Sequence, residues 1–121
     1  MLLGNFFTIA TIEQEDGRAK AILELNPSHS IFNGHFPGQP VVPGVCTMQM
    51  IVETLEKILD KRLQVKSADH MKFLSFIDPR INPALTLDVS YVQEQSQLNL
   101  TARLFHGDTV FLKMKAQLLT S

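Results

Sequence analysis

The segment between Pro27 and Gly44 most restricts how this chain can fold. It shows neither a helical nor a strand period, and the twelve residues from His35 to Cys46 include three prolines and two glycines. Each proline presets its own φ and restricts the residue before it, so the segment costs little entropy to fix. Loops of this length in compact domains are usually functional. The sequence therefore predicts a stiff functional loop ahead of whatever begins at Gly44.

One amphipathic helix is predicted directly after this loop, over residues 45–63. Apolar residues recur there with a spacing of 3.6 for five turns, which is typical of a helix with one buried face. They are Val45, Met48, Ile51, Val52, Leu55, Ile58, Leu59 and Leu63. Charged residues gather in the second half of the helix, so we expect the first half to be buried and the second half to face water.

Six strand-like segments flank the helix. Residues 5–14 and 18–26 form a hairpin pattern around Asp16-Gly17, and four further runs cover residues 64–77, 84–93, 97–105 and 109–119. Prolines, glycines and polar clusters separate the runs, as turns require. This order predicts an α+β fold, with an antiparallel sheet wrapped around one long helix. The length of 121 residues is that of a single domain, residues 1–121.

Composition argues against several classes of partner. The chain is 45% hydrophobic and 19% charged, which is typical of globular proteins. Eleven basic and twelve acidic residues give a net charge of −1 without any block of like charge, so neither nucleic acid nor a membrane surface is expected as a partner. No apolar run reaches membrane-spanning length, and the single Cys46 fits a reducing compartment. We therefore expect a cytoplasmic protein.

His35 and Gly44 suggest a chemistry. Gly44 lies where the helix should begin, so its amide N–H and those of Val45 and Cys46 should point outward at the positive end of the helix dipole. Such amides can hold a carbonyl oxygen as it gains negative charge. A neutral imidazole nearby can take a proton near pH 7. Together these groups suit removal of an α-proton from a thioester, with a purely structural hydrogen bond as the alternative role of His35.

Residues 34–45, GHFPGQPVVPGV, resemble the signature of the hot-dog-fold 3-hydroxyacyl-acyl carrier protein dehydratases of fatty-acid synthesis, which reads His-Phe-Pro-Gly-x-Pro-x-x-Pro-Gly. The chain contains all seven fixed residues, His35, Phe36, Pro37, Gly38, Pro40, Pro43 and Gly44. The order of predicted elements also agrees with a hot-dog fold, in which the helix would be the buried centre. Outside residues 29–53 the resemblance is mainly architectural.

The resemblance implies roles for particular residues. His35 would remove the α-proton and help to expel the β-hydroxyl as water, while the Gly44 amide would bind the thioester carbonyl. Two subunits would pair their sheets edge to edge, with His35 of one facing the helix of the other and the acyl chain in a tunnel between them. The substrate would be a thioester of acyl carrier protein or coenzyme A, without a cofactor. We expect substrate contacts from Phe36, Pro43, Val45, Met48, Phe73 and Phe76.

The chain departs from the family at the catalytic acid. The family places Glu or Asp five residues after the second glycine, where this chain has Gln49. An amide cannot release a proton, although it can orient a water or a substrate oxygen. Glu53, one helical turn further on, stands where the family commonly has Gln, so the two residues are exchanged. Glu53 shares a helix face with Gln49.

Two interpretations of Glu53 stay open. In the first it is a relocated catalytic acid, since a desolvated carboxyl has a raised pKa and stays protonated. Alternatively it is a buried carboxylate paired with a backbone amide or a basic group, or the start of the wet face of the helix. The predicted catalytic set is accordingly His35, Gly44, Gln49 and Glu53.

Three functions are consistent with the sequence. The first is a hydro-lyase that dehydrates 3-hydroxyacyl thioesters as a homodimer. The second is a hot-dog acyl thioesterase, and the third is a non-catalytic acyl-binding subunit that completes a heterodimeric dehydratase. Cys46 is interpreted as a small core residue and His29 as a brace for the loop. His70 and His106 share no metal-ligand spacing, so no metal is predicted.

Overall fold

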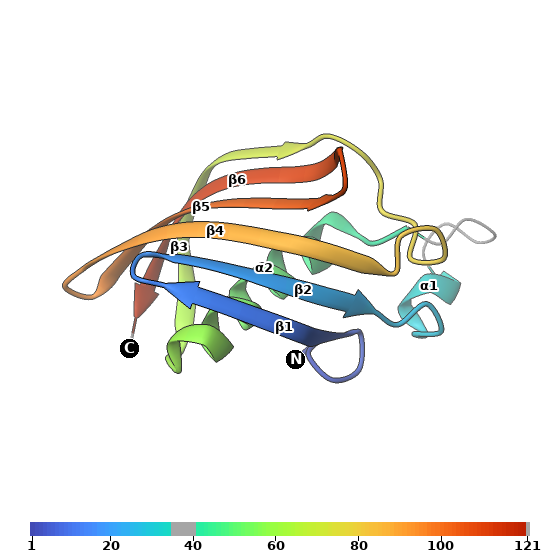
Figure 1. Cartoon of the computed structure of the whole chain (residues 1–121), viewed down its shortest axis with the longest axis horizontal. Helices are drawn as coiled ribbons and strands as arrows, with labels where there is room; N and C mark the ends of the chain where they lie inside the picture. The colour runs from blue at the N-terminus through green and yellow to red at the C-terminus, as the bar shows by residue number, and fades with distance from the viewer. Residues whose placement is uncertain (35–40, 121) are drawn as a thin grey trace.

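The computed structural model describes residues 1–34 and 41–120, and in it one sheet curves around one long helix (Figure 1). The strands are β1 (Phe7–Glu15), β2 (Arg18–Leu25), β3 (Leu63–Phe73), β4 (Ala84–Glu94), β5 (Gln97–His106) and β6 (Thr109–Thr120). The helices are the short α1 (Ile31–Gly34) and the long α2 (Gly44–Leu59). The predicted α+β arrangement is confirmed. Neither of these helices has the length and apolar character needed to span a bilayer.

The sheet order is β1-β2-β4-β5-β6-β3, and every neighbouring pair is antiparallel. Three of the pairs are hairpins, and the turn between β1 and β2 places Gly17 at a φ of +75°, which favours glycine. Helix α2 connects β2 to β3 in sequence, but these strands are not neighbours, since β2 pairs with β4 and β3 pairs with β6. Strands β1 and β3 therefore form the two edges of the sheet.

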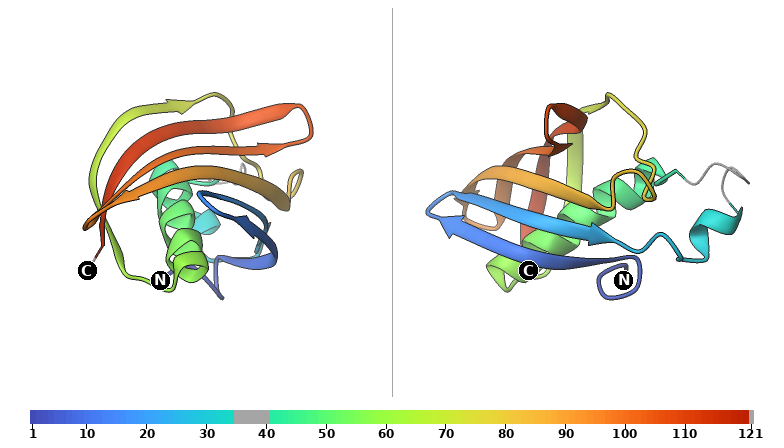
Figure 2. Two further views of the ribbon diagram at one scale, coloured as in Figure 1. Left: turned by 60° about the vertical axis from the view of Figure 1, so that its left-hand side comes forward. Right: turned by 45° about the vertical axis from the view of Figure 1, so that its right-hand side comes forward.

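The concave face of the sheet holds the core. Along β2, buried and exposed residues alternate at every position, and the buried ones are Ala19, Ala21, Leu23 and Leu25. This period of two turns one face of each strand toward α2. On the helix, Met50, Ile51 and Leu55 have no exposed surface. Figure 2 shows the sheet curving over α2, which fixes the helix axis against the sheet.

Two element ends differ from the sequence prediction, and the second of them shapes the site. Helix α2 stops at Leu59, because Asp60 adopts a left-handed φ of 52° and its N–H donates to the carbonyl of Glu56. Strand β3 ends at Phe73 instead of reaching residue 77. Beyond it, the N–H of Val42 donates to the carbonyl of Ile77 at 2.9 Å. Residues 74–77 are therefore joined to the segment that leads into α2.

The first half of α2 is not uniformly buried, contrary to expectation. Val45 is 76% exposed and Gln49 is also exposed, whereas Cys46, Thr47 and Met50 are buried. The sheet covers only one side of the helix, so the residues on the other side stay uncovered by the described part of the chain.

Truncation of the helix core tests this packing. Leu55→Ala should lower the free energy of unfolding by about 2–5 kcal/mol, because it leaves a cavity between α2 and the sheet. Val92→Ala, on an exposed position of β4, should change it by less than about 0.5 kcal/mol. Urea denaturation measures both values. Equal losses in the two variants would contradict the packing described.

Candidate active site

The first turn of α2 has two backbone amides without a partner in the described part of the chain. Pro43 caps the helix in an extended conformation, and its carbonyl accepts hydrogen bonds from the N–H groups of Cys46 at 3.0 Å and Thr47 at 3.1 Å. The N–H groups of Gly44 and Val45 have no hydrogen-bond partner within residues 1–34 and 41–120. The expectation that the Cys46 amide points outward was therefore wrong, because this N–H donates to the Pro43 carbonyl within a tight first turn. The outward donors are those of Gly44 and Val45.

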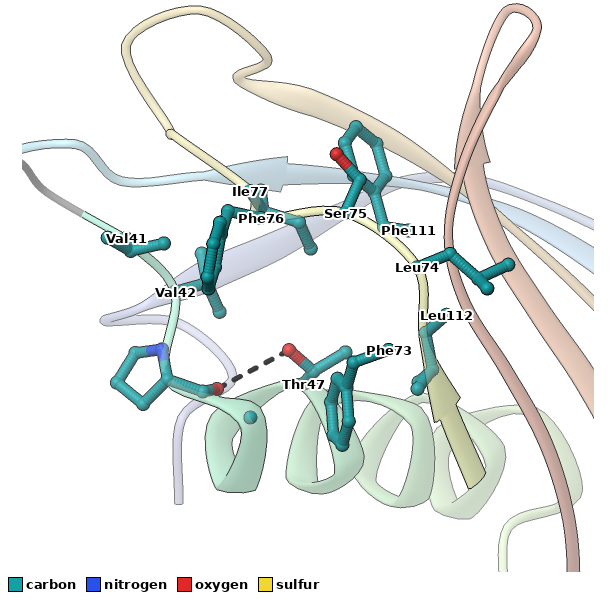
Figure 3. A pocket seen from close by; sticks show the side chains of 12 residues that line it. Val41, Val42, Thr47, Phe73, Leu74, Ser75, Phe76, Ile77, Phe111 and Leu112 are labelled. Atoms are coloured by element: carbon teal, nitrogen blue, oxygen red, sulfur yellow. Dashed lines mark hydrogen bonds between the residues drawn. The ribbon is translucent and has the colours of Figure 1, made fainter. Parts of the chain in front are cut away.

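A cavity of about 570 Å³ opens beside this helix start (Figure 3). Its walls come from three segments: residues 41–44 with Thr47, residues 73–77 and Phe111-Leu112. The lining is predominantly apolar, which suits an acyl chain. Figure 3 shows Phe73 and Phe76 on either side of the cavity, with Thr47 donating to the Pro43 carbonyl at 3.4 Å. Of the predicted site residues, the cavity brings together Pro43, Gly44, Phe73 and Phe76.

Gly44 also packs closely against Phe73. A Cβ at position 44 would lie 3.0 Å from Cζ and 3.2 Å from Cε1 of the Phe73 ring. Carbon atoms in contact normally stay farther apart, so a side chain at this position would displace the ring. The absence of a side chain at Gly44 thus keeps the ring against the helix start and the amide open to the cavity.

Gln49 and Glu53 lie together outside this cavity. Glu53 is only 3% exposed, and its Oε1 accepts hydrogen bonds from the backbone N–H groups of Leu2 at 2.9 Å and Leu3 at 2.8 Å. Its Oε2 accepts from the Leu2 N–H at 3.0 Å and from Nε2 of Gln49 at 2.8 Å. The carboxylate therefore joins the start of the chain to α2.

The ionisation of Glu53 follows from these contacts. Burial by itself raises the pKa of the carboxyl, but hydrogen bonds from the Leu2 and Leu3 amides and from Gln49 outweigh it and hold the pKa below its ordinary value. The interpretation that required a raised pKa is wrong on this point. Glu53 is a buried carboxylate paired with backbone amides, as the alternative interpretation proposed.

The remaining predicted residues fall in several places. His35 and Phe36 lie outside the described residues. Val45 and Met48 are on α2 but do not line the cavity. The cavity is lined instead by Val42, Leu74 and Ile77 from the loops and by Phe111 and Leu112 from β6. The sequence did not identify these five residues as site residues. Their apolar character alone did not distinguish them from core residues.

Two other side chains have structural roles. Cys46 is buried, and burial raises the pKa of its thiol. The Nδ1 of His29 accepts a hydrogen bond from the Ile31 N–H at 3.1 Å, and its ring packs edge-on against Phe6. The described residues contain no group of three or more His, Cys, Asp or Glu arranged to hold a metal ion.

Solved structures define the class of fold. The chain superposes on the dehydratase heterocomplex ApeI:P from Xenorhabdus doucetiae with a TM-score of 0.72 and 24% identity, covering 92% of this chain and 96% of that one. It superposes on a hypothetical thioesterase protein with coenzyme A from Streptococcus pneumoniae with a TM-score of 0.67 and 10% identity, covering 95% and 85%. The fold is the hot-dog fold.

Sequence relatives then define the family. A profile of the ApeI-like family, described as ApeI dehydratase, matches residues 11–113, so the chain belongs to this dehydratase family. The chain is 29% identical over 70 residues to the 3-hydroxyacyl-[acyl-carrier-protein] dehydratase FabZ of Mannheimia succiniciproducens, covering 57% of this chain and 47% of that protein. It is 30% identical over 61 residues to FabZ of Haemophilus influenzae, covering 50% and 41%. It spans about half the length of the curated relatives it matches.

The hydrogen bonds to Glu53 predict a particular pH dependence of stability. Because the folded-state pKa of Glu53 lies below its unfolded value, its contribution is present above about pH 4.5 and lost as pH falls through the folded value. Glu53→Gln should therefore cost about 1–2 kcal/mol at pH 7. The difference between the two proteins should shrink toward pH 3 in urea denaturation. A cost that stays constant or grows on acidification would contradict this account.

Proposed function

We propose that this protein binds 3-hydroxyacyl thioesters and dehydrates them to trans-2-enoyl thioesters. One observation carries the proposal: the amide of Gly44, which has no partner among residues 1–34 and 41–120, lies at the wall of an apolar cavity, directly after the His35 motif that resembles the dehydratase signature. Membership in the ApeI-like dehydratase family supports it. We propose acyl carrier protein as the carrier, with coenzyme A as the alternative, and the cytoplasm as the location, in line with the single cysteine.

In the proposed reaction His35 acts first as a base. Its neutral imidazole removes the α-proton, and the electron pair of the broken C–H bond moves to the thioester carbonyl. The Gly44 N–H holds the resulting enolate oxygen at the positive end of α2. The enolate then collapses to a Cα–Cβ double bond as the Cβ–O bond breaks. Carbonyl stabilisation by a fixed amide is the part that the helix start supplies.

The leaving hydroxyl needs a proton, and neither residue at the exchanged positions is suited to give one. Gln49 has no acidic proton, and the low pKa of Glu53 keeps its carboxyl ionised. We therefore assign this step to His35: the imidazolium formed in the first step protonates the departing hydroxyl, which leaves as water. His35 returns to its neutral form, so the cycle closes without a separate acid.

We propose that the active form is a dimer. Several large apolar side chains near the helix start are more than half exposed in the described part of the chain, namely Val45, Phe73, Leu74, Phe76 and Ile81. Exposed apolar groups gathered in this way mark interaction surfaces. Strand β3 is also an open edge of the sheet. Pairing of two β3 edges would cover these side chains and bring His35 of one subunit to α2 of the other.

A second candidate is a non-catalytic subunit that binds the acyl group and completes a heterodimer. The exchange of Gln49 and Glu53 favours it, because the acid position carries an amide. A neighbour in fold is itself described as a dehydratase heterocomplex. In this case a related subunit would supply the acid. Thioester hydrolysis is the third candidate, with Gln49 orienting a water.

Turnover by the purified chain separates these candidates. With 3-hydroxyacyl carrier thioesters, His35→Ala should lower kcat by at least about 100-fold, because it removes both the base and the proton donor. His106→Ala, an exposed histidine in β5, serves as the matched control and should leave kcat unchanged. Formation of the enoyl product is measured by absorbance and mass spectrometry.

The outcomes have distinct meanings. Unchanged turnover in His35→Ala would contradict the dehydratase mechanism. An inert wild type that gains activity in Gln49→Glu, or on addition of a related subunit, would favour the heterodimer. Release of free acid from acyl thioesters without enoyl product would favour the thioesterase.

Gly44→Ala tests the close packing at the cavity. The added methyl group should displace the Phe73 ring and raise the Kd for an acyl thioester about tenfold, which corresponds to about 1.4 kcal/mol. Ser75→Ala, which removes an atom from the same cavity wall, should change the Kd by less than about threefold. Unaltered binding in Gly44→Ala would place the acyl group elsewhere.

A further inference from the structure

The carboxamide of Gln49 is held in one orientation. Its Nε2 lies 2.8 Å from Oε2 of Glu53, on the same face of α2. A carboxylate offers lone pairs and no proton, so it can pair only with the NH₂ side of the amide. The reverse orientation would set two acceptors against each other. Gln49 therefore turns Nε2 toward Glu53 and directs Oε1 away from it, and the residue is exposed.

The Glu53 carboxylate is itself fixed in orientation. It is 3% exposed, and the N–H groups of Leu2 and Leu3 both donate to its Oε1. Rotation of the carboxylate would leave these two backbone donors without their partner, and unpaired buried donors are costly. The orientation at position 49 is thus set by backbone amides about fifty residues away in the chain.

We propose that Glu53 makes position 49 an acceptor of hydrogen bonds, and that the site thereby selects acyl thioesters with a hydroxyl on Cβ over those with a carbonyl there. This inference rests on the proposed function, in which α2 of one subunit faces His35 of the other across the dimer, and it takes the exposed Gln49 of that helix to lie at the Cβ of the acyl group. Glu53 is a positioning residue in this arrangement, because it acts on the substrate only through Gln49.

The selection follows from the hydrogen-bond chemistry of the two substrates. A β-hydroxyl donates its hydrogen to Oε1 of Gln49 and keeps its lone pairs free for the proton that converts it to water. A β-carbonyl has lone pairs only, so it would meet Oε1 as acceptor against acceptor. One hydrogen bond gained or lost amounts to roughly a tenfold difference in affinity. Wild type should accordingly prefer 3-hydroxyacyl over 3-oxoacyl ligands by about that factor.

Glu53→Gln should reverse this preference. The Leu2 and Leu3 amides need an acceptor, so the new side chain should keep its oxygen at the Oε1 position and set its NH₂ group toward Gln49. Gln49 would then turn its own oxygen inward and present Nε2 outward as a donor. The site would favour a β-carbonyl over a β-hydroxyl. A purely structural role of Glu53 would weaken binding of both ligands equally.

The experiment measures binding without turnover. Calorimetry gives the Kd of 3-hydroxyacyl and 3-oxoacyl amide analogues, in which nitrogen replaces the thioester sulfur, for the full chain in its native assembly. Three variants accompany wild type: Glu53→Gln, Gln49→Met and Glu56→Gln. Gln49→Met removes the outward acceptor and leaves the Leu2 and Leu3 contacts in place. Glu56→Gln makes the same change of group at a carboxylate that accepts a backbone N–H, that of Leu63 at 3.0 Å.

We expect about tenfold preference for the hydroxyl ligand in wild type and Glu56→Gln, no preference in Gln49→Met, and the opposite preference in Glu53→Gln. Equal affinities in wild type overturn the inference and leave the proposed function standing. A hydroxyl preference that persists in Gln49→Met overturns it even if Glu53→Gln does not fold. Failure of wild type to bind either analogue overturns the proposed function and this inference with it.

Discussion

The packing of α2 against the concave face of the sheet is the constraint on which the rest of the structure depends. Met50, Ile51 and Leu55 are fully buried there, so the helix can neither rotate nor slide without exposing apolar surface. Its fixed axis then sets two further positions. The helix begins at Gly44, beside the cavity, and the side chain of Gln49 points away from the sheet.

A buried carboxylate is the second defining feature, and it depends on the first. Removing an ionised group from water is costly unless donors replace its hydration. Glu53 meets that requirement with amides from Leu2, Leu3 and Gln49. The same bonds that allow Glu53 to be buried also fix the orientation of Gln49. Exchange of the two residues relative to the family pattern therefore moves the carboxylate by one helical turn and puts an oriented amide at position 49.

Periodicity predicted much of the fold. The period of 3.6 placed α2, and alternating strands with turn residues placed all six strands, because both signals come from residues close together in sequence. The end of α2 was missed, since the left-handed conformation of Asp60 has no strong local signal in an aspartate. The end of β3 was missed because Val42 and Ile77 meet only in the folded chain.

The candidate site was predictable only in part. The motif from His35 to Gly44 predicted an amide donor at Gly44, and the family resemblance predicted Pro43, Phe73 and Phe76 as substrate contacts. These four residues line the cavity, whereas His35 and Phe36 lie outside the described residues. The hydrogen-bond donors to Glu53 could not be inferred, because the apolar residues Leu2 and Leu3 have the sequence pattern of an ordinary strand. Their amides are about fifty residues distant. The catalytic roles of His35, Gly44 and Gln49 stay predictions.

The central claim is that an ionised Glu53 holds the amide of Gln49 with its oxygen outward. A pH titration of the wild type, followed by ¹H–¹⁵N NMR of the Gln49 side-chain amide, tests it directly. The Nε2–H resonances should shift with a midpoint below the ordinary value for glutamate, 4.5, while the backbone spectrum stays that of the folded protein. Chemical shifts that do not change with pH, or a titration midpoint above the ordinary glutamate value, would contradict the claim.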